Sequence, residues 1–317
     1  MKANRVSIVI PTYKRPGRVL EAIASCLSQI HLPYEVLIGD DSPDEATAQA
    51  IASLAPVAGV SLRYMHNKPS LGQVSNVNNL FSQAQGELVM LLHDDDLLLP
   101  ESLATLTGIL NENPEVSLAY GRQYIIEDNG DINAESSISF NRDFYRDAEF
   151  EGTVLTPFEA GLGQQIPNNG YLLRAEVLQH IRLRPESGDG CDYDFGFQLG
   201  LAGYRPYFIN KYLGMYRLSN QGVTTAGGHA GGGDAGYQAY RLMRNCQIDT
   251  PRAQAIRNRR LYERAPIAIT ECVVRGKKKE ALAIYFGRWY RSRMLSLGGI
   301  KRILYILFYM SPTRLAK

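Results

Sequence analysis

The 317-residue sequence lacks the features that mark several common classes of protein. Its four cysteines (Cys26, Cys191, Cys246 and Cys272) are widely spaced and form no CxxC pair, which argues against a zinc site and a disulfide framework. No GxGxxG follows the first predicted strand and no GxxxxGK[ST] occurs, so the dinucleotide fingerprint and the P-loop are both absent. No apolar run approaches the roughly 20 residues needed to cross a bilayer, and no signal peptide precedes Val6. We therefore expect a globular protein located in the cytoplasm.

Charge is distributed very unevenly along the chain. Residues 252–317 hold 16 of the 34 Lys and Arg but only three acidic residues, a net charge of +13. The rest of the chain has 18 basic and 29 acidic residues and therefore carries −11. Such a basic segment predicts contact with an anionic partner, either nucleic acid or a phospholipid surface.

The composition of this basic tail favours the membrane surface and excludes nucleic acid as our expected partner. Between residues 288 and 310, aromatic and aliphatic side chains alternate with Arg and Lys, a pattern typical of helices that lie at a membrane interface. Two alternatives stay open: this stripe packs on the rest of the protein with its arginines in solvent, or it joins copies of the chain in a homo-oligomer. Upstream, residues 252–286 predict two helices joined near Gly276.

The first 92 residues alternate between short apolar, β-branched runs and segments with helical spacing. The strands are expected at 6–10, 34–39, 60–65 and 87–92, and the helices at 17–30, 45–54 and 72–84. This alternation predicts an α/β fold with a mostly parallel central sheet flanked by helices.

Polar clusters follow the predicted strands, and in a parallel sheet they should converge on one edge. They are Pro11-Thr12-Tyr13, Asp40-Asp41, His66-Asn67 and Asp94-Asp95-Asp96. Three adjacent carboxylates repel one another and are best tolerated where a divalent cation takes their oxygens. The alternative is a solvated acidic turn that caps the helix beginning near Pro100.

Five segments together resemble glycosyltransferase family 2, whose members are inverting, nucleotide-sugar-dependent enzymes of the Rossmann-like GT-A fold. The segments are 6–15, 35–42, the group Asn67, Leu71-Gly72 and Asn76, 94–96, and 191–195. The resemblance implies a GT-A domain over 1–225, with a nucleotide-binding half (1–126) and an acceptor half (127–225). A glycine-rich loop and linker (226–250) and the basic helical tail (251–317) would follow.

The resemblance also implies contacts with a nucleoside diphosphate sugar. Thr12 and Tyr13 would line the nucleoside pocket, and Asp41 or Asp40 would accept the imide hydrogen of a uracil-like base. An Asx turn is the alternative for one of these two aspartates. The donor-contacting residues implied are Pro11, Thr12, Tyr13, Arg15, Asp40, Asp41, Asn67, Gly72, Asn76, Asp94, Asp95 and Arg217. Arg217 would contact phosphate, although Ser219 stands where many members have a His that completes the metal site.

By the same resemblance, the triple aspartate is the DXD motif that holds Mn²⁺ or Mg²⁺. Asp96 would bind the metal directly, and Asp94 would assist it. Three consecutive aspartates leave the alignment with the DXD motif ambiguous, so Asp95 could take either role.

The general base would lie in Cys191-Asp192-Tyr193-Asp194, where Cys191 replaces the usual Glu. We expect Asp192 to be this base rather than Asp194, and the alternative role for Asp192 is a helix cap.

These inferences predict transfer of a hexose, with inversion, from a UDP-sugar to a hydroxyl of a cell-surface glycan or a lipid-linked acceptor. The enzyme would dock on the inner face of the cytoplasmic membrane. The competing hypothesis is a catalytically inactive module of the same fold that binds a nucleotide sugar or a membrane. A sugar nucleotidyltransferase is disfavoured, because the glycine- and basic-rich loop expected after its first strand is absent.

Overall fold

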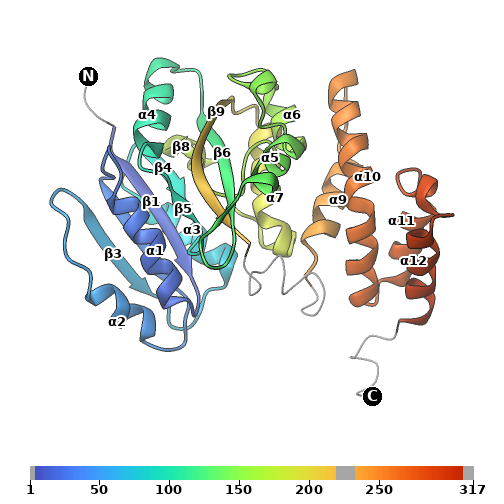
Figure 1. The fold of residues 1–317 in the computed structure, drawn as a ribbon, viewed down its shortest axis with the longest axis horizontal. Helices are drawn as coiled ribbons and strands as arrows, with labels where there is room; N and C mark the ends of the chain where they lie inside the picture. The colour runs from blue at the N-terminus through green and yellow to red at the C-terminus, as the bar shows by residue number, and fades with distance from the viewer. Residues whose placement is uncertain (1–3, 219–232, 310–317) are drawn as a thin grey trace. The chain divides into compact units, whose positions relative to one another are not determined.

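The computed structural model describes residues 4–218 and 233–309, which form two compact units (Figure 1). The sheet unit comprises residues up to Pro185 together with Phe195–Ser219, and the helical unit comprises Glu186–Asp194 and the chain from Asn220 onward. The boundary between them passes through helix α7 (Cys191–Leu201), whose first turn belongs to the helical unit.

The sheet unit is built around one mixed sheet with the order β3-β2-β1-β4-β8-β6-β9-β5, and β7 pairs with β6. As predicted, β1 to β4 are mutually parallel, whereas β8 runs antiparallel to both β4 and β6. The strands are β1 (Val6–Thr12), β2 (Glu35–Asp40), β3 (Ser61–His66), β4 (Leu88–Leu91), β5 (Leu97–Leu98), β6 (Leu118–Ile126), β7 (Ile132–Asn133), β8 (Leu172–Arg174) and β9 (Pro206–Arg217).

Helices cover both faces of this sheet. Ile8 and Ile38 lie on the face that packs against α1 and α4, while Gly39 approaches Leu80 of α3. This two-sided burial explains why the strands read as continuous apolar runs rather than as alternating ones. The helices are α1 (Pro16–Leu27), α2 (Ala46–Ala52), α3 (Gln73–Gln83), α4 (Ser102–Glu112), α5 (Ala134–Asp143), α6 (Pro157–Leu162) and α7, with 3-10 turns η1 (Ala148–Phe150), η2 (Ala175–Gln179) and η3 (Pro185–Gly190).

The helical unit contains the predicted hairpin, since α10 (Pro251–Val274) and α11 (Lys278–Tyr285) pack together and are joined through Gly276 at φ +72°. A 3-10 turn η5 (Arg291–Arg293) and helix α12 (Leu297–Phe308) follow. The prediction of a loop and linker over 226–250 was wrong in part, because α9 (Ala235–Asn245) lies there and packs on α10. Its buried Tyr237, Tyr240 and Met243 recur at helical spacing, a signal that the neighbouring glycines obscured.

Two predictions fall partly on residues that the structure does not describe. They are the loop expected over the glycine-rich stretch before Gly233 and the role of Ser219. Among the helices that are described, none combines the length and the apolar character required to cross a bilayer.

Candidate active site

The predicted polar clusters do converge on one edge of the sheet unit. Thr12 ends β1, Asp40 ends β2, and the acidic turn follows β4, so all three lie at the carboxyl ends of neighbouring parallel strands. The Thr12 hydroxyl donates to Asp94, and the Asp41 amide, directly after β2, donates to the Thr12 carbonyl. The carboxyl end of β9 reaches the same turn through the Arg217 amide, which donates to Asp96. This edge is where ligands bind in open α/β sheets.

Asp94 is held by the first strand and the first helix. Its carboxylate accepts hydrogen bonds from Thr12 Oγ1 (2.7 Å) and Arg15 Nη1 (3.0 Å). Arg15 Nη1 also lies 2.9 Å from Asp95 Oδ2, so one guanidinium bridges two of the three aspartates. Burial raises the pKa of Asp94, and Arg15 opposes that rise. Thr12, Arg15 and Asp94 therefore stabilise the acidic turn itself.

Asp96 is the most deeply buried of the three aspartates and is held by Asn169 and by Arg217 at the end of β9. Its carboxylate accepts hydrogen bonds from Asn169 Nδ2 and from the backbone amide of Arg217, each at 2.8 Å. Burial first, and then the charge of Asp95, raise the pKa of Asp96 above its ordinary value. The fold thus holds the Asp96 carboxylate where its charged form is disfavoured. A cation bound beside it would stabilise that charged form.

His93, Asp95 and Asp96 each bring a potential ligand atom within 4.8 Å of the others. Beside them, the Oδ1 atom of Asn169 is buried and has no hydrogen-bond partner among the residues that the structure describes. An imidazole, two carboxylates and an amide oxygen form a donor set that suits Mn²⁺ or Mg²⁺. The residues present therefore fit a divalent cation, with Asp95 rather than Asp94 grouped with Asp96.

Asp40 and Asp41 differ in a way that the sequence alone left open. Asp40 is fully buried, and its carboxylate accepts from the Ser42 amide (2.8 Å) and the Tyr64 hydroxyl (2.7 Å). The Asx turn therefore uses Asp40. Asp41 accepts three hydrogen bonds from the segment 67–72, and a carboxylate offers about four acceptor sites, so one remains for a ligand.

Asn67 and Gly72 hold the Asp41 carboxylate by direct hydrogen bonds, and Asn76 in turn holds Asn67. The Gly72 amide and Asn67 Nδ2 donate to its two oxygens at 2.7 and 2.8 Å. Asn67 Nδ2 also donates to Asn76 Oδ1, and Asn76 Nδ2 donates to the Gly39 carbonyl. A Cβ atom at position 39 would lie 2.1 Å from Asn76 Oδ1, so only glycine fits at this point of β2. These residues position Asp41, and their contact with a donor stays a prediction.

Tyr13 presents an aromatic ring at the same edge. It is 51% exposed, directly after the buried Thr12, with Pro11 half-buried on the other side. The Lys14 ammonium lies 5.0 Å from the centre of the Tyr13 ring, and the Lys14 amide donates to Ser42 in the neighbouring loop. An exposed ring anchored in this way is available to stack on a planar base.

The Arg217 side chain contacts protein groups. Nε donates to the Asp95 carbonyl (2.9 Å), Nη2 pairs with Glu21 (2.6 Å), and Nη1 donates to the carbonyls of Glu127 and Asp128. Since its side chain is only 1% exposed, the guanidinium holds the acidic turn in place. Its predicted contact with a phosphate stays a prediction.

Asp192 and Asp194 lie in the first turn of α7, within the helical unit. Asp194 is fully buried and accepts a hydrogen bond from Ser187 Oγ at 2.8 Å. Asp192 is half-buried and is the second residue of the helix, so it lies inside the helix rather than at its N-cap. Of the two carboxylates, Asp192 is the more accessible to a substrate.

Other residues of the helical unit hold the loop that leads to Asp192. The Arg275 guanidinium lies 3.5 Å from an oxygen of Asp189 and 3.0 Å from one of Asp234. Asp189 also accepts the Asp234 amide, and the Arg264 guanidinium lies 5.8 Å from the centre of the Tyr193 ring. The candidate base thus lies in the first turn of α7, the part of that helix that belongs to the helical unit.

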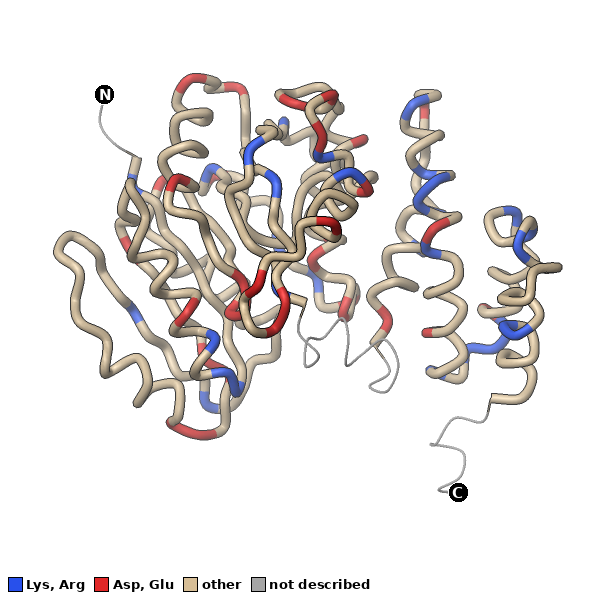
Figure 2. Tube along the Cα trace, viewed as in Figure 1, with Lys and Arg blue, Asp and Glu red and all other residues tan. Residues whose placement is uncertain are grey.

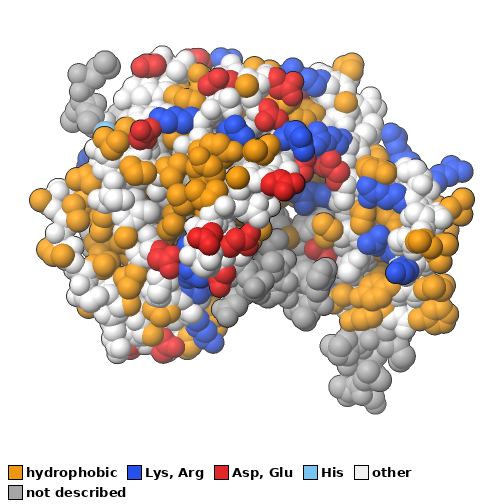
Figure 3. All heavy atoms as spheres, in the orientation of Figure 1, with side chains coloured by type: hydrophobic (Ala, Val, Ile, Leu, Met, Phe, Trp, Pro, Cys, Tyr) orange, Lys and Arg blue, Asp and Glu red, His pale blue; other side chains and the backbone are white. Residues whose placement is uncertain are grey.

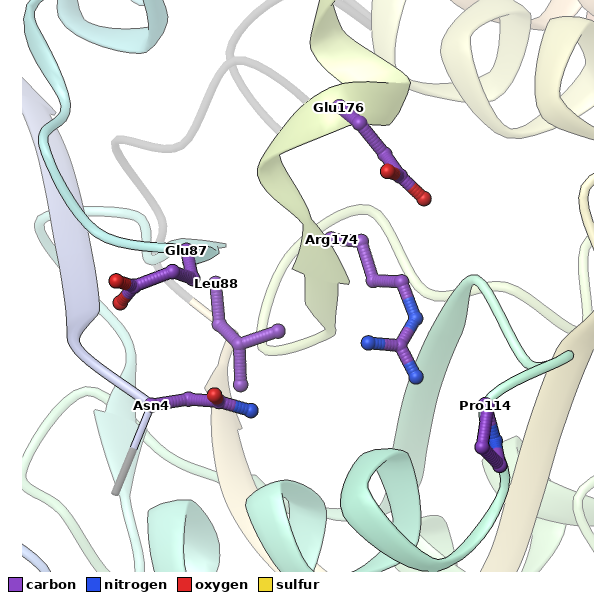
Figure 4. Close-up of a pocket in the computed structure, with 6 residues that line it drawn as sticks. All are labelled: Asn4, Glu87, Leu88, Pro114, Arg174 and Glu176. Carbon is purple, nitrogen blue, oxygen red and sulfur yellow. The ribbon is translucent and has the colours of Figure 1, made fainter. Parts of the chain in front are cut away.

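A separate pocket of about 240 Å³ opens at the other end of the strands (Figure 4). It is lined by Asn4, Glu87, Leu88, Pro114, Arg174 and Glu176. Arg174 donates to the carbonyls of Leu110, Asn113 and Val116, so it ties the end of β8 to α4 and to the loop that follows α4. The pocket shares no residue with the candidate site and lies at the amino end of β4.

Sequence reasoning assigned no role to His93 or Asn169. His93 directly precedes the three aspartates, and this position was the only signal in the sequence that it could be a metal ligand. Asn169 is separated from Asp96 by 73 residues and has no motif of its own, so only the fold reveals that the two are in contact.

Comparison with known proteins identifies the family. The model of the family described as glycosyl transferase family 2 matches residues 7–165. The chain belongs to glycosyltransferase family 2. This glycosyltransferase is similar to the GalNAc(5)-diNAcBac-PP-undecaprenol beta-1,3-glucosyltransferase of Campylobacter jejuni. The two are 26% identical over 247 residues, and the matched region covers 75% of this chain and 70% of that protein.

Two solved structures show the same fold. TarS of S. aureus in complex with UDP-GlcNAc matches with a TM-score of 0.59 at 14% identity, over 95% of this chain and 89% of that one. The mannosyltransferase PcManGT of Pyrobaculum calidifontis in complex with GDP-Man and Mn²⁺ matches with a TM-score of 0.61 at 16% identity, over 97% and 88%. The glycosyltransferase therefore has the GT-A fold expected from its sequence.

Proposed function

We propose that this glycosyltransferase transfers a hexose, with inversion, from a UDP-sugar to a lipid-linked acceptor, and that the transfer requires Mn²⁺ or Mg²⁺. The observation that carries the proposal is the edge of the sheet where His93, Asp95 and Asp96 lie together with a supported Asp41 carboxylate and an exposed Tyr13 ring. A nucleoside diphosphate offers both a planar base and the oxyanions that a cation binds.

Each group of residues would have a distinct task. Tyr13 stacks on the base, and the remaining acceptor site of Asp41 takes its imide hydrogen. His93, Asp95 and Asp96 hold the cation, with the Asn169 oxygen beside them. When bound, a divalent cation neutralises negative charge on the departing nucleoside diphosphate.

Transfer with inversion also needs a base for the acceptor. The acceptor oxygen forms a bond to the anomeric carbon as the bond from that carbon to the diphosphate oxygen breaks, and the acceptor proton passes to Asp192. We assign this role to Asp192 because Asp194 is buried against Ser187. The assignment agrees with the position of the base in the family motif.

The proposals for the substrates draw on the relatives. The Campylobacter jejuni relative is named for an acceptor carried on undecaprenol diphosphate, and the TarS structure contains UDP-GlcNAc. A lipid-linked acceptor would place this enzyme at the inner face of the cytoplasmic membrane, in contact with the anionic surface through residues 288–310.

Thermal unfolding tests the donor site. A ligand that binds only the folded protein raises its stability, and at about 100 times its Kd the gain is about 2.7 kcal/mol, or roughly 5 °C or more in Tm. We expect UDP with Mn²⁺ to give this rise, with GDP and dTDP giving less, and Tyr13→Ala to reduce it. Ile30→Ala, at an exposed position after α1, is the matched control. If no nucleoside diphosphate shifted the Tm of the native protein, the proposed donor site would be wrong.

A further inference from the structure

Helix α12 presents an apolar stripe to solvent. Leu297, Ile300, Leu304, Leu307 and Phe308 are all exposed, with Leu297 at 81% and Phe308 at 75%. At 3.6 residues per turn, their spacing places them on one face of the helix, about 100° wide. Large apolar side chains gathered on one exposed face mark an interaction site.

The opposite face of α12 is fixed to the rest of the helical unit. Ile306 is fully buried, and Gly299 fits so closely that a Cβ atom there would lie 2.1 Å from the Arg293 carbonyl. The Tyr285 hydroxyl donates to the Gly299 carbonyl at 3.2 Å, and the Ser296 side chain caps the first turn of the helix. The apolar stripe is therefore held outward by a docked helix.

Positive charge surrounds the stripe and is not matched by acidic residues. Lys301 lies on the exposed face of α12, and Arg288 and Arg291 are exposed just before it. No acidic residue follows Glu280 in the sequence. Figure 2 shows Lys and Arg recurring along the C-terminal helices, and Figure 3 shows hydrophobic side chains beside them.

The three acidic residues of the basic tail already have partners within the helical unit. Glu263 pairs with Arg259 and Arg260, Glu271 accepts the amides of Gly236 and Tyr237, and Glu280 accepts the Tyr237 hydroxyl. They therefore leave the cations near α12 available to an anionic partner.

We infer that α12 docks on an anionic phospholipid bilayer, lying in the plane of the interface with Leu297, Ile300, Leu304, Leu307 and Phe308 immersed. The helix spans about 18 Å at 1.5 Å per residue, too short to cross the roughly 30 Å hydrocarbon core. An outward apolar face with flanking Lys and Arg is the design of a helix that lies on a membrane. The inference rests on the proposed function and deepens it, because it assigns the proposed membrane contact to one face of α12 and names the side chains that enter the bilayer.

Vesicle sedimentation of the full-length protein tests the inference. We expect the protein to bind phosphatidylcholine vesicles containing 30% phosphatidylglycerol, and to bind pure phosphatidylcholine much more weakly. The double variant Leu304→Ser/Leu307→Ser should lose at least tenfold in binding, and Lys301→Glu/Arg291→Glu should weaken binding and its dependence on salt. The matched control Ile30→Ser/Leu201→Ser replaces two exposed apolar residues of the sheet unit and should bind as the native protein does.

Either of two results would overturn the inference: native protein that does not bind anionic vesicles, or stripe variants that bind as well as the control. A protein that forms a dimer in solution without binding vesicles, and becomes monomeric in Leu304→Ser/Leu307→Ser, would instead show that the stripe joins two copies of the chain. Vesicle binding is measured without donor, so its failure is distinct from a failure of the nucleotide-dependent rise in Tm.

Discussion

Asp96→Asn is expected to lower the rate of sugar transfer by at least about 10³-fold. A bound cation contributes several kcal/mol of charge stabilisation in the transition state, and about 1.4 kcal/mol corresponds to a factor of ten. The variant removes a ligand charge but keeps one side-chain oxygen, which can still accept the Arg217 amide. Initial rates measured at saturating Mn²⁺ give the loss, and thermal unfolding shows whether the variant is folded.

Asp94→Asn tests whether Asp94 or Asp95 binds the metal together with Asp96. Asp94 contacts Thr12 and Arg15 and lies outside the group of His93, Asp95 and Asp96. Asp94→Asn should therefore retain the Mn²⁺-dependent rise in Tm that Asp96→Asn loses. Glu115→Gln is the control: it changes an exposed residue next to Pro114, which lines the pocket at the amino end of β4, and it should change neither the rate nor the rise in Tm. The reverse pattern, with the rise lost in Asp94→Asn and kept in Asp96→Asn, would contradict the proposed ligand set.

Asp192→Asn is expected to reduce the turnover rate by at least about 10²-fold, the effect of losing a general base. Because Asp192 is half-buried and outside the acidic turn, the UDP-dependent rise in Tm should stay as in the native protein. Measurement of the rate at saturating donor, together with the thermal shift, distinguishes a lost base from lost binding.

Asp194→Asn supplies the comparison for this prediction. The Asp194 carboxylate is fully buried and accepts from Ser187, so its loss should mainly lower the Tm. If Asp194→Asn lost the same activity with no change in stability, while Asp192→Asn kept full activity, the base would be Asp194.

The arrangement of the sheet could be predicted from local patterns. Short β-branched runs such as Val6-Ser7-Ile8-Val9-Ile10 are buried on both faces, and this signal survives in the sequence because helices cover both sides of the sheet. Once the strands are parallel, the polar residues at their carboxyl ends must meet. The convergence of Thr12, Asp41 and the acidic turn followed from that rule.

The direction of individual side chains could not be predicted in the same way. Which of the three consecutive aspartates lie beside His93 depends on contacts with Arg15, Asn169 and Arg217, which are distant in sequence. The segment carrying Asp192 was assigned to the GT-A domain, yet it packs with the helical unit through Asp189 and Arg275. Pairing between distant segments leaves no local periodicity, so neither feature had a sequence signal.

Chelation of divalent cations during turnover tests whether sugar transfer by this enzyme requires a metal ion. The rate of sugar transfer from the preferred UDP-sugar to a polyprenyl-diphosphate-linked acceptor would be measured from the release of UDP. The measurement is made first with Mn²⁺ and then with excess EDTA. We expect EDTA to stop transfer and added Mn²⁺ or Mg²⁺ to restore it. A full rate of transfer in excess EDTA would show that the enzyme needs no divalent cation, contrary to the proposed function.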